Sequence, residues 1–588
     1  MKKLKFLSVF AVIAGLLLMN SCSEEFLEIT PNGSLDQSVL ATYEGVDALL
    51  VGAYSLLDGV TGSFGWDAGT SGWVYGSIRG MEANKGTDSG DQPAINPLQQ
   101  YTETSTNSYL NNKWRALYEG ISRCNSTILT ANMAADAGTI DSDELAWFIA
   151  QARAIRGWYH LEAWRLWADM STNTFVPYVD ENTDQATLTN DVDIRSMIID
   201  DLTAGVSLPN DMGQPGRFNK TVCQFFLAKA YMQMYRDYSS ALPLLNTVVS
   251  SGTNPAGQAC GLMDKYGDIF DVENRNDIES IYTVQYSVND ASGGRNGGYA
   301  EVLNFPYKSG GSPGGCCGFF NPTQDFVNSF RTNAGGLPFI DLAAGTFSYN
   351  DEKVSNDQGV AIDAPYVEYA GQLDPRVDWS VGRRGIPYWD WGPHTGQDWI
   401  RDQTYSGPYS PKKQVYQQSQ EGTYTEVGNW TSGYTANGYR MARYSDAVLL
   451  KAECEAMSGA DDLGFGEVNL VRARAANPAG FVMEDDGVTP AANYVINEYP
   501  TPFGSGAEAM VAIKFERKLE LGQEGHRYYD LQRWGDVQTE LTRILAYEKT
   551  MEWGNALYGG ATIGPEDKNF PLPQRQIDLA NGNLLQNR

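Results

Sequence analysis

Three helical patterns near the C-terminal end constrain the fold of this chain most strongly. Apolar residues recur at helical spacing over Ser445–Met457, where Ser-Asp marks a start and Gly459 a stop. A second pattern covers Gly466–Ala476 and ends at Asn477-Pro478, because proline disfavours the helical conformation of the residue before it. Two such helices joined by a short Gly/Asp loop form an antiparallel hairpin, the unit of tetratricopeptide-like repeats.

The third pattern, Ala509–Leu521, is too densely charged for a plain amphipathic helix. A solvated surface face is one interpretation of such a charge run. The charged residues continue into the stretch that follows the helix and are Lys514, Glu516, Arg517, Lys518, Glu520, Glu524 and Arg527.

These patterns carry a resemblance to a known family. The segments RYSDAVLLKAECEA, EVNLVRARA and IKFERKLELGQEGHRYYDLQRWG resemble the C-terminal signature of the SusD/RagB family, and NFPLPQRQIDLANGNLLQN is similar to its last segment. The family consists of surface lipoproteins of Bacteroidetes-type bacteria that capture nutrients, mostly glycans, for a TonB-dependent transporter. The resemblance therefore implies a fold and a general role, and leaves the ligand open.

Further helical patterns precede this region. Aromatic residues at helical spacing are core far more often than site, so we interpret Trp158 and His160 as structural and expect Met234 and Tyr235 to face inward. Together with the C-terminal pair, these patterns predict a mainly α fold of about four tetratricopeptide-like hairpins. The patterns cover residues 35–57, 109–131, 142–167, 193–208, 220–238 and 240–250.

We expect a single folded body over residues 35–588, with helical repeats at about 35–252 and 439–548. A long loop-rich insertion at about 253–438 separates the two sets of repeats and carries few helical signals. One segment in it, Ser280–Tyr286, alternates like a strand. Because loops on a rigid scaffold carry binding groups, we expect this insertion to carry the ligand face.

The first 34 residues are typical of a lipoprotein. Three lysines precede the apolar run Phe6–Met19, which is typical of a signal peptide over residues 1–21. Cys22 after a small residue resembles a lipobox cysteine, and residues 22–34 would form a lipidated tether. The resemblance implies anchoring to the outer face of the outer membrane; an ordinary secreted protein with an incidental cysteine is the alternative.

Charge limits the partners. The formal net charge of −29 over 588 residues argues against nucleic acid and anionic membrane surfaces as ligands. We expect no cofactor and no metal site, because the three histidines lie far apart and no metal-binding motif occurs. Binding of a Ca²⁺ ion in the Asp-rich loops is an open alternative.

Candidate ligand-binding residues lie in two loop-rich regions. Gly59–Gln99 lacks a strong period, and long segments of that kind inside a compact protein are usually functional or disordered. The insertion holds two further clusters, around residues 310–320 and 374–413. For the tryptophans of both regions, packing onto the helices is the alternative interpretation. The candidates are Trp66, Asp67, Trp73, Asp88, Cys316, Cys317, Phe319, Arg383, Arg384, Trp389, Trp391 and Tyr405.

The adjacent pair Cys316-Cys317 predicts a disulfide between neighbours. The cell exterior favours oxidation, and the flanking glycines permit the unusual backbone angles of an eight-membered ring. Such a ring would present a rigid apolar patch to a sugar. A reduced pair, or bridges to Cys260, are the alternatives, whereas we interpret the cysteines at 124, 223 and 454 as buried apolar residues.

The sequence argues against catalysis. Residues 310–314 match G-x-S-x-G, but Pro313 lacks the N–H group that an oxyanion hole needs at that position. Residues 410–413 match S-x-x-K, a pattern short enough to occur by chance. Paired carboxylates of a glycoside hydrolase stay an open alternative, because any acidic protein offers candidates.

The resulting hypothesis is a non-catalytic protein of the cell surface. It would bind a nutrient oligosaccharide or polysaccharide and deliver it to a SusC-like TonB-dependent transporter of the outer membrane, as the resemblance implies. The same role for peptides or another non-glycan oligomer is the main alternative, and a glycan-active surface enzyme is the lesser one.

Overall fold

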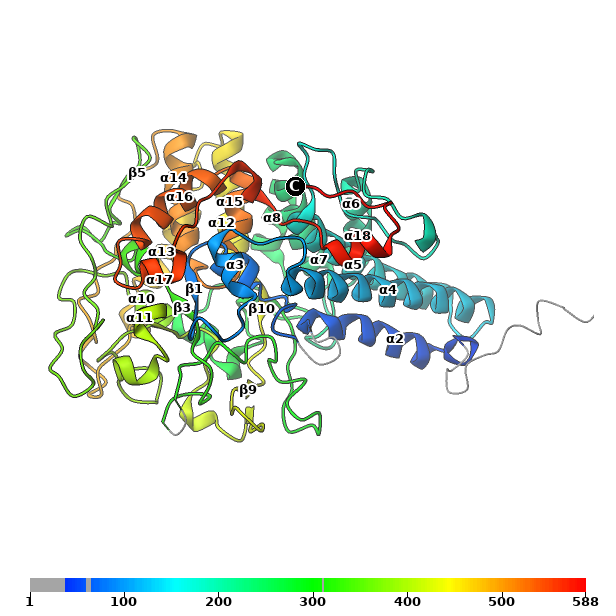
Figure 1. Cartoon of the computed structure of the whole chain (residues 1–588). Helices are drawn as coiled ribbons and strands as arrows, with labels where there is room; N and C mark the ends of the chain where they lie inside the picture. The colour runs from blue at the N-terminus through cyan, green and yellow to red at the C-terminus, as the bar shows by residue number, and fades with distance from the viewer. Residues whose placement is uncertain (1–36, 60–64, 309–310) are drawn as a thin grey trace, which may run out of the picture.

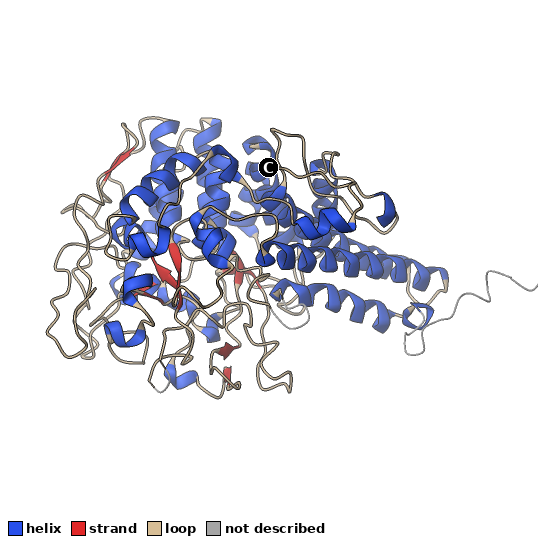
Figure 2. Ribbon diagram, in the orientation of Figure 1, coloured by secondary structure: helices blue, strands red, loops and turns tan. Residues whose placement is uncertain are grey.

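The computed structural model describes residues 37–59, 65–308 and 311–588. Long helices form most of the regular structure, and the strands are few and short (Figure 2). The mainly helical fold predicted from the sequence is therefore confirmed. The signal peptide, the tether and Cys22 lie outside the described residues.

The long helices form four consecutive hairpins. The pairs are α4 with α5, α6 with α7, α8 with α12, and α13 with α14, and each pair packs against the next (Figure 1). Helix α2 lies beside α4 at one end of the row, α15 packs against the π-helical turn Tyr231–Tyr235 that follows α7, and α16 packs against α15. The bounds are α2 Tyr43–Ser55, α4 Ser108–Asp136, α5 Ser142–Trp167, α6 Arg195–Ala204, α7 Lys220–Ala230, α8 Tyr238–Ser251, α12 Tyr444–Ser458, α13 Phe465–Ala475, α14 Gly506–Glu520, α15 Arg527–Trp534 and α16 Val537–Glu548.

Local sequence signals set the ends of these helices. Asp141 accepts hydrogen bonds from the first backbone N–H groups of α5 and forms a capping box with Glu144, which satisfies donors that a helix start leaves unpaired. Helix α12 ends at Gly459 in the left-handed conformation, as predicted. Gly120 lets α4 approach α5 closely, because a Cβ there would lie 2.5 Å from Cζ of Tyr159.

Helices α8 and α12 are neighbours in space although the whole insertion separates them in sequence. The Tyr444 hydroxyl donates to the Val249 carbonyl oxygen over 2.8 Å. One helix earlier, Lys229 of α7 pairs with Asp446 of α12 at 3.0 Å. The insertion is therefore a loop region that leaves the helical row and returns to it at the same place (Figure 1).

In the part of the chain that the structure describes, the loops contain short helices and five two-stranded antiparallel sheets. Strand β2 of the predicted segment pairs with β10, which leads directly into α12. The strand pairs are β1 Ala83–Gly86 with β3 Phe319–Pro322, β2 Ser280–Thr283 with β10 Arg440–Arg443, β4 Ile340–Asp341 with β5 Thr346–Phe347, β6 Val381–Gly382 with β7 Ser410–Pro411, and β8 Thr425–Glu426 with β9 Tyr434–Thr435. The short helices are α3 Ile95–Gln100, α9 Gln324–Ser329, α10 Val377–Ser380, α11 Gln403–Ser406, α17 Gly554–Tyr558 and α18 Gln574–Leu579.

The dense charges of α14 are buried, so their interpretation as a solvated face is wrong. The carboxylate of Glu520 forms ion pairs with Arg376 at 3.1 Å, with Arg443 at 3.0 Å and with Arg474 at 2.5 Å. Burial raises the pKa of Glu520, but the arginines outweigh it and hold that pKa well below its usual range. Because Arg376 also binds Asp374 at 2.7 Å, the Asp-Pro-Arg segment fastens the insertion to α14.

The segment Gly59–Gln99 is more regular than its composition predicts. Its described part contains a π-helical turn over Trp73–Ile78, strand β1 and helix α3, and most of these residues are buried. Sequence periodicity does not reveal this regular structure, because strand β1 pairs with strand β3, which lies in the insertion far along the chain. The segment is therefore part of the core that supports the loops.

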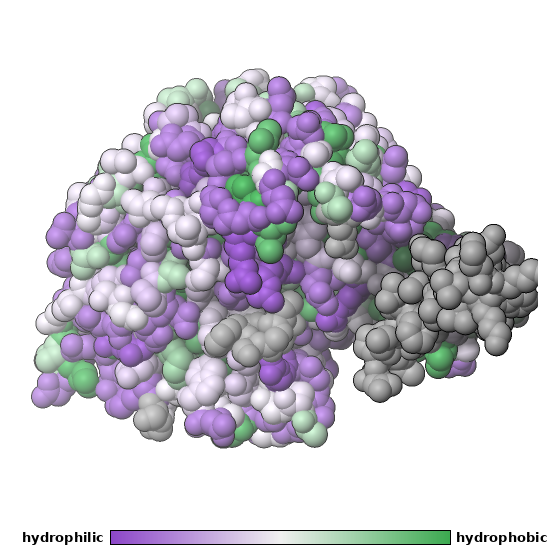
Figure 3. All heavy atoms as spheres, turned by 45° about the vertical axis from the view of Figure 1, so that its right-hand side comes forward, coloured by the Kyte–Doolittle hydropathy of each residue, from purple (hydrophilic) through white to green (hydrophobic). Residues whose placement is uncertain are grey.

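One face of the molecule is mostly polar (Figure 3). On the face shown in Figure 3, hydrophilic side chains predominate and hydrophobic ones are scattered in small groups. Among the described helices, none combines the length and the hydrophobicity that crossing a membrane requires. Within the same residues, no group of three or more His, Cys, Asp or Glu side chains is arranged to hold a metal ion.

Candidate functional site

Four aromatic rings from three separate loops form a cluster at the surface. The rings of Trp66 and Tyr299 are stacked with centroids 5.4 Å apart, and Tyr299 is also stacked with Tyr434 at 5.9 Å. Trp430 stands edge-on to both Trp66 and Tyr434, at 6.4 and 6.0 Å. Trp430 is 43% exposed, Trp66 and Tyr299 are half-buried and Tyr434 is buried. We call these four residues the ring cluster.

The buried indole of Trp73 holds two of these loops together. Its Nε1 donates to the backbone oxygens of Trp66 at 3.1 Å and of Ala300 at 3.0 Å. Trp73 is 3% exposed and packs edge-on against Phe319 and Phe320 of β3. The sequence candidates Trp73 and Phe319 therefore support the ring cluster from the core side.

Glycines make room for the innermost ring. A Cβ on Gly294 would lie 2.4 Å from Cδ2 of Tyr434, and one on Gly428 would lie 2.2 Å from its Cε2. Gly294 also has φ of +81°, in the region that favours glycine. These two positions cannot carry a larger side chain without moving Tyr434.

A disulfide joins Cys316 to Cys317, as the sequence predicted. Cys317 is buried, Cys316 is half-buried, and Gly314, Gly315 and Gly318 around them all have positive φ. The turn formed by residues 314–318 is called the disulfide turn below.

Backbone hydrogen bonds connect the disulfide turn to the loops of the ring cluster. Gly318 N donates to the Phe305 oxygen over 2.8 Å, a few residues after Tyr299. The Thr431 hydroxyl, next to Trp430, donates to the Gly314 oxygen over 2.9 Å. The disulfide therefore lies beside the rings. The ring cluster and the disulfide turn together are called the aromatic face.

A charged group with one more aromatic ring lies on the other side of the disulfide turn. Arg401 pairs with Asp88 at 2.9 Å and with Asp91 at 2.6 Å, and its guanidinium carbon lies 5.2 Å from the Tyr307 ring centroid. A Cβ on Gly318 would meet Cβ of Tyr307 at 3.0 Å, which places this group next to the disulfide. Burial raises the pKa of Asp88, but backbone N–H groups and Arg401 outweigh it and keep that pKa below its usual range.

Four other predicted ligand residues are buried or hydrogen-bonded to other protein groups. Asp67 is buried and accepts a hydrogen bond from Asn112 over 2.6 Å. Arg383 is buried in a two-bond pair with Asp378. Arg384 donates to backbone oxygens of residues 360–364. Tyr405 is buried and donates to Asn96 over 2.9 Å. These contacts leave the four side chains outside the aromatic face.

Trp389 and Trp391 are half-buried in a neighbouring part of the insertion. Trp389 packs against Trp379 at 5.1 Å, and Trp391 donates to the Tyr416 oxygen over 2.9 Å. Both tryptophans thus pack in small local cores of the insertion.

Sequence reasoning brought Trp66, Asp88, Cys316 and Cys317 to this region, and missed Tyr299, Trp430, Tyr434, Tyr307 and Arg401. One sequence feature could have identified the missed aromatic residues. Each of Tyr299 and Trp430 lies in a Gly- and Asn-rich loop that lacks helical or strand periodicity, as at Gly298-Tyr299 and Asn429-Trp430.

The S-x-x-K pattern at residues 410–413 does not give its serine a basic partner. Ser410 lies 2.9 Å from Nε2 of His394, but Gly396 N donates to Nδ1 over 3.0 Å, so Nε2 carries the proton and donates to the serine. A histidine that donates to the serine cannot act as its base. Lys413, the last residue of S-x-x-K, pairs with Glu524 at 2.7 Å.

Comparison with known proteins identifies the family. A family model described as the SusD family matches residues 278–588. The chain belongs to the SusD family. A curated SusD-like relative, SusD-like protein P25 of Formosa agariphila, is 23% identical over 583 residues, which cover 97% of this chain and 96% of the relative.

Solved SusD-family structures share the fold along almost the whole chain. A laminarin-binding SusD-like protein superimposes with a TM-score of 0.63 at 19% identity, covering 93% of this chain and 99% of its own. Surface glycan-binding protein A from Bacteroides thetaiotaomicron, in complex with laminarihexaose, gives a TM-score of 0.61 at 21% identity with the same coverage. At these identities the SusD-family likeness establishes the fold alone.

Proposed function

We propose that this protein captures a nutrient oligosaccharide or polysaccharide at the cell surface through the aromatic face. The observation that carries the proposal is the partly exposed ring cluster, which lies beside an apolar disulfide and near the carboxylates and guanidinium around Arg401. Sugar rings have apolar C–H faces that pack on aromatic rings, and hydroxyl groups that hydrogen-bond to charged side chains. Family membership and the glycan ligands of the two solved relatives support the same class of ligand.

Binding measurements test the proposal directly. Isothermal titration of the purified protein with laminarihexaose, with other neutral oligosaccharides of similar length and with peptides should show heat for at least one saccharide and none for the peptides. Binding of peptides alone would move the protein to the non-glycan alternative.

We place the protein as a non-catalytic binder. Neither the Ser410–His394 pair nor Lys413 has the geometry of an active serine, as described above. Incubation with a bound oligosaccharide should leave its chain length unchanged over hours. Products that vanish on replacement of a single carboxylate would contradict this.

Delivery to a SusC-like TonB-dependent transporter is the next step of the proposed role. Family membership is its support. Affinity purification after mild detergent extraction should recover a large β-barrel protein together with this chain. Repeated recovery of the chain alone would contradict the partnership.

Anchoring through Cys22 would hold the protein at the outer-membrane surface. Replacement Cys22→Ser removes the acylation site, and without the acyl chains the protein should be released or mislocalised. A variant that still incorporates palmitate and stays on the cell surface would show that another residue is the anchor.

A further inference from the structure

A second pocket opens beside the C-terminal end of α5 and shares no residue with the aromatic face. Its volume is about 380 Å³, within the range of small-ligand pockets. Walls come from α5, from the π-helical turn Tyr231–Tyr235 and Arg236 after it, from α15 and from the segment before α18. The side chains that the argument uses are Trp164, Arg165, Arg195, Tyr235, Arg236 and Arg533, joined by Lys568 and Asp169.

The wall of this pocket is cationic, in contrast to the net charge of −29. Five basic side chains line it and Asp169 is the one carboxylate among the lining residues. Most of the bases are held in place by acids. Arg195 pairs with Asp193 at 2.6 Å and Lys568 with Asp169 at 2.8 Å. Arg533 pairs with Asp530 at 2.9 Å and also with Glu453, and Arg165 pairs with Glu162. These ion pairs hold the basic side chains in place, and some of their N–H donors still have no acceptor.

Several donors in the wall have no protein partner. Arg236 makes no ion pair or side-chain hydrogen bond with any described residue, and it is exposed. Nε of Arg165 and Nε1 of Trp164 are buried and lack an acceptor among the described protein atoms. Of these groups, the exposed guanidinium of Arg236 is free to donate to an anionic group in the pocket.

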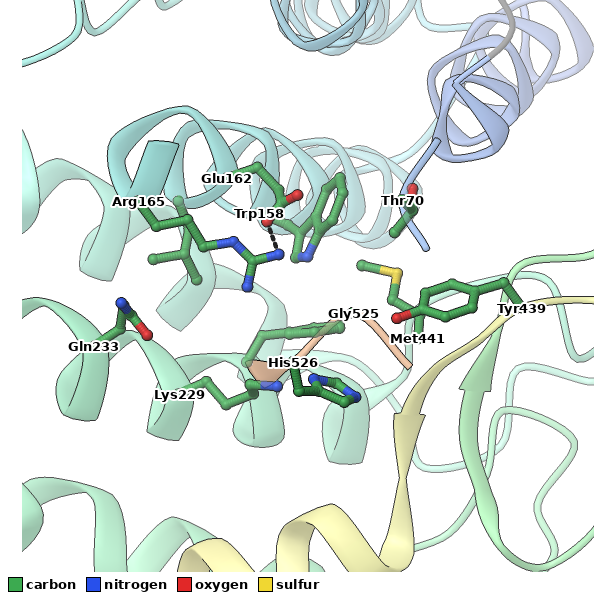
Figure 4. Close-up of a pocket in the computed structure, with 12 residues that line it drawn as sticks. Thr70, Trp158, Glu162, Arg165, Lys229, Gln233, Tyr439, Met441, Gly525 and His526 are labelled. Carbon is green, nitrogen blue, oxygen red and sulfur yellow. Dashed lines mark ion pairs between the residues drawn. The ribbon is translucent and has the colours of Figure 1, made fainter. Parts of the chain in front are cut away.

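Two small inner cavities lie next to the pocket, and Arg165 and Gln233 line all three. The larger has about 30 Å³, room for about two water molecules. Figure 4 shows Arg165, paired with Glu162, on one side of this cavity and Lys229 on the other. Burial lowers the pKa of both Arg165 and Lys229, and each cation is paired in the interior with one carboxylate, Glu162 and Asp446 respectively.

The rim of the pocket is suited to a sugar ring. Tyr235 is 42% exposed, contrary to the inward position expected from its helical pattern, and the Arg195 guanidinium lies 4.5 Å from its ring centroid. Met170 beside it is also exposed. We propose that this pocket binds a saccharide that carries a carboxylate, sulfate or phosphate group. The charged group would contact Arg236 and Arg165, and the ring would lie against Tyr235.

The test compares acidic and neutral saccharides on the purified protein. Titration with a uronate oligosaccharide, a sulfated one and a neutral one of the same length should show binding to this pocket only for the acidic ligands. Arg236→Gln should weaken that binding about tenfold, the scale of losing one charge-assisted hydrogen bond. Arg575→Gln, at an exposed arginine elsewhere, is the matched control and should leave the affinity unchanged.

Three outcomes would overturn the proposal. Unchanged affinity of Arg236→Gln and of Tyr235→Ala for the acidic ligand would remove this pocket from binding. Inorganic sulfate that binds as tightly as the sulfated saccharide would exclude a role for the sugar ring. Acidic-ligand binding that disappears in Trp430→Ala would locate it at the aromatic face instead. A different result would contradict the proposed function and leave this pocket proposal intact: acidic saccharides bind at the pocket, but no saccharide binds at the aromatic face.

Discussion

The ring of Trp66 lies parallel to that of Tyr299, with the two planes 13° apart, although Trp66 precedes helix α4 and Tyr299 follows helix α8 in the chain. Each ring alone would be an ordinary loop aromatic. Stacked, they form a preordered surface, so a ligand that packs on it does not have to order the loops first.

Removal of the most exposed ring should weaken ligand binding and leave stability almost unchanged. We expect Trp430→Ala to lower the affinity for the saccharide by about 1–2 kcal/mol, the scale of an aromatic contact, with a melting temperature close to wild type. Val427→Ala, at an exposed apolar residue of the same loop, is the control for titration calorimetry. Equal affinities of the two variants would exclude Trp430 from the site.

Loss of the disulfide should affect the same site. The Cys316→Ser/Cys317→Ser double variant removes the apolar patch beside the rings, and we expect about 1–2 kcal/mol of lost affinity. Mass spectrometry of the native protein should find the peptide two hydrogens lighter than its reduced form. Cys260→Ser is the control, and an unchanged affinity of the double variant would show that the disulfide serves the fold alone.

Trp73 should influence binding without touching the ligand. Trp73→Phe keeps the apolar packing but loses the hydrogen bonds to Trp66 and Ala300, so we expect about 1–3 kcal/mol of lost stability and a weaker affinity. Trp167→Phe is a matched control, because Nε1 of this buried tryptophan has no hydrogen-bond partner among the described protein atoms. Melting and titration curves should separate the two variants; identical behaviour would mean that the two bonds do not order the loops.

The buried ion network around Glu520 should be essential for folding. Glu520→Gln leaves Arg376, Arg443 and Arg474 without their shared carboxylate in the interior, and we expect a loss of about 3–5 kcal/mol in the free energy of unfolding. Denaturant titration measures it, with the exposed substitution Glu44→Gln as reference. A loss below about 1 kcal/mol would mean that water screens the network.

Glu301, just after the ring of Tyr299, should make stability depend on pH. Burial raises its pKa from 4.5 to about 7, and the hydroxyl groups of Ser71 and Tyr286, the second of which donates to Glu301 over 3.0 Å, lower that pKa only in part. Below pH 4.5 the carboxyl is protonated in both the folded and the unfolded state and contributes nothing. Between pH 4.5 and 7 the folded state holds the proton more tightly, so the free energy of unfolding falls as pH rises and stays low above pH 7.

Replacement by glutamine removes this titration. Glu301→Gln should stabilise the protein at pH 8 by up to about 3 kcal/mol and have little effect at pH 4. Thermal unfolding at the two pH values measures the difference. A gain of the same size at both would attribute the effect to packing instead of charge.

Local sequence signals predicted the helices well. The limits of α5 agree with the predicted pattern because Asp141 and Glu144 form a cap that depends on nearby residues alone. The disulfide between Cys316 and Cys317 was predictable for the same reason, since the partners are adjacent.

The site was harder to predict because its parts meet only in three dimensions. Arg383 attracted attention as a charged loop residue, yet Asp378, five positions away, neutralises it in the interior. Tyr299 and Trp430 lie in loops whose composition is unremarkable in isolation, and the stacking that makes them a surface depends on Trp66 and Trp73 from the other side of the chain. No hydrophobic periodicity or sequence motif predicts these contacts between distant loops.

The side-by-side position of α8 and α12 means that the insertion has its entrance and its exit at one point of the helical row. A block with neighbouring ends can be grafted onto a related scaffold without stretching the connections. A graft of this kind would still have to present a carbonyl oxygen at the place of Ala300, which accepts from the host's Trp73, and an aromatic ring at the place of Tyr299, on which the host's Trp66 stacks. A change of ligand preference by exchange of the insertion is thus constrained at these two adjacent residues.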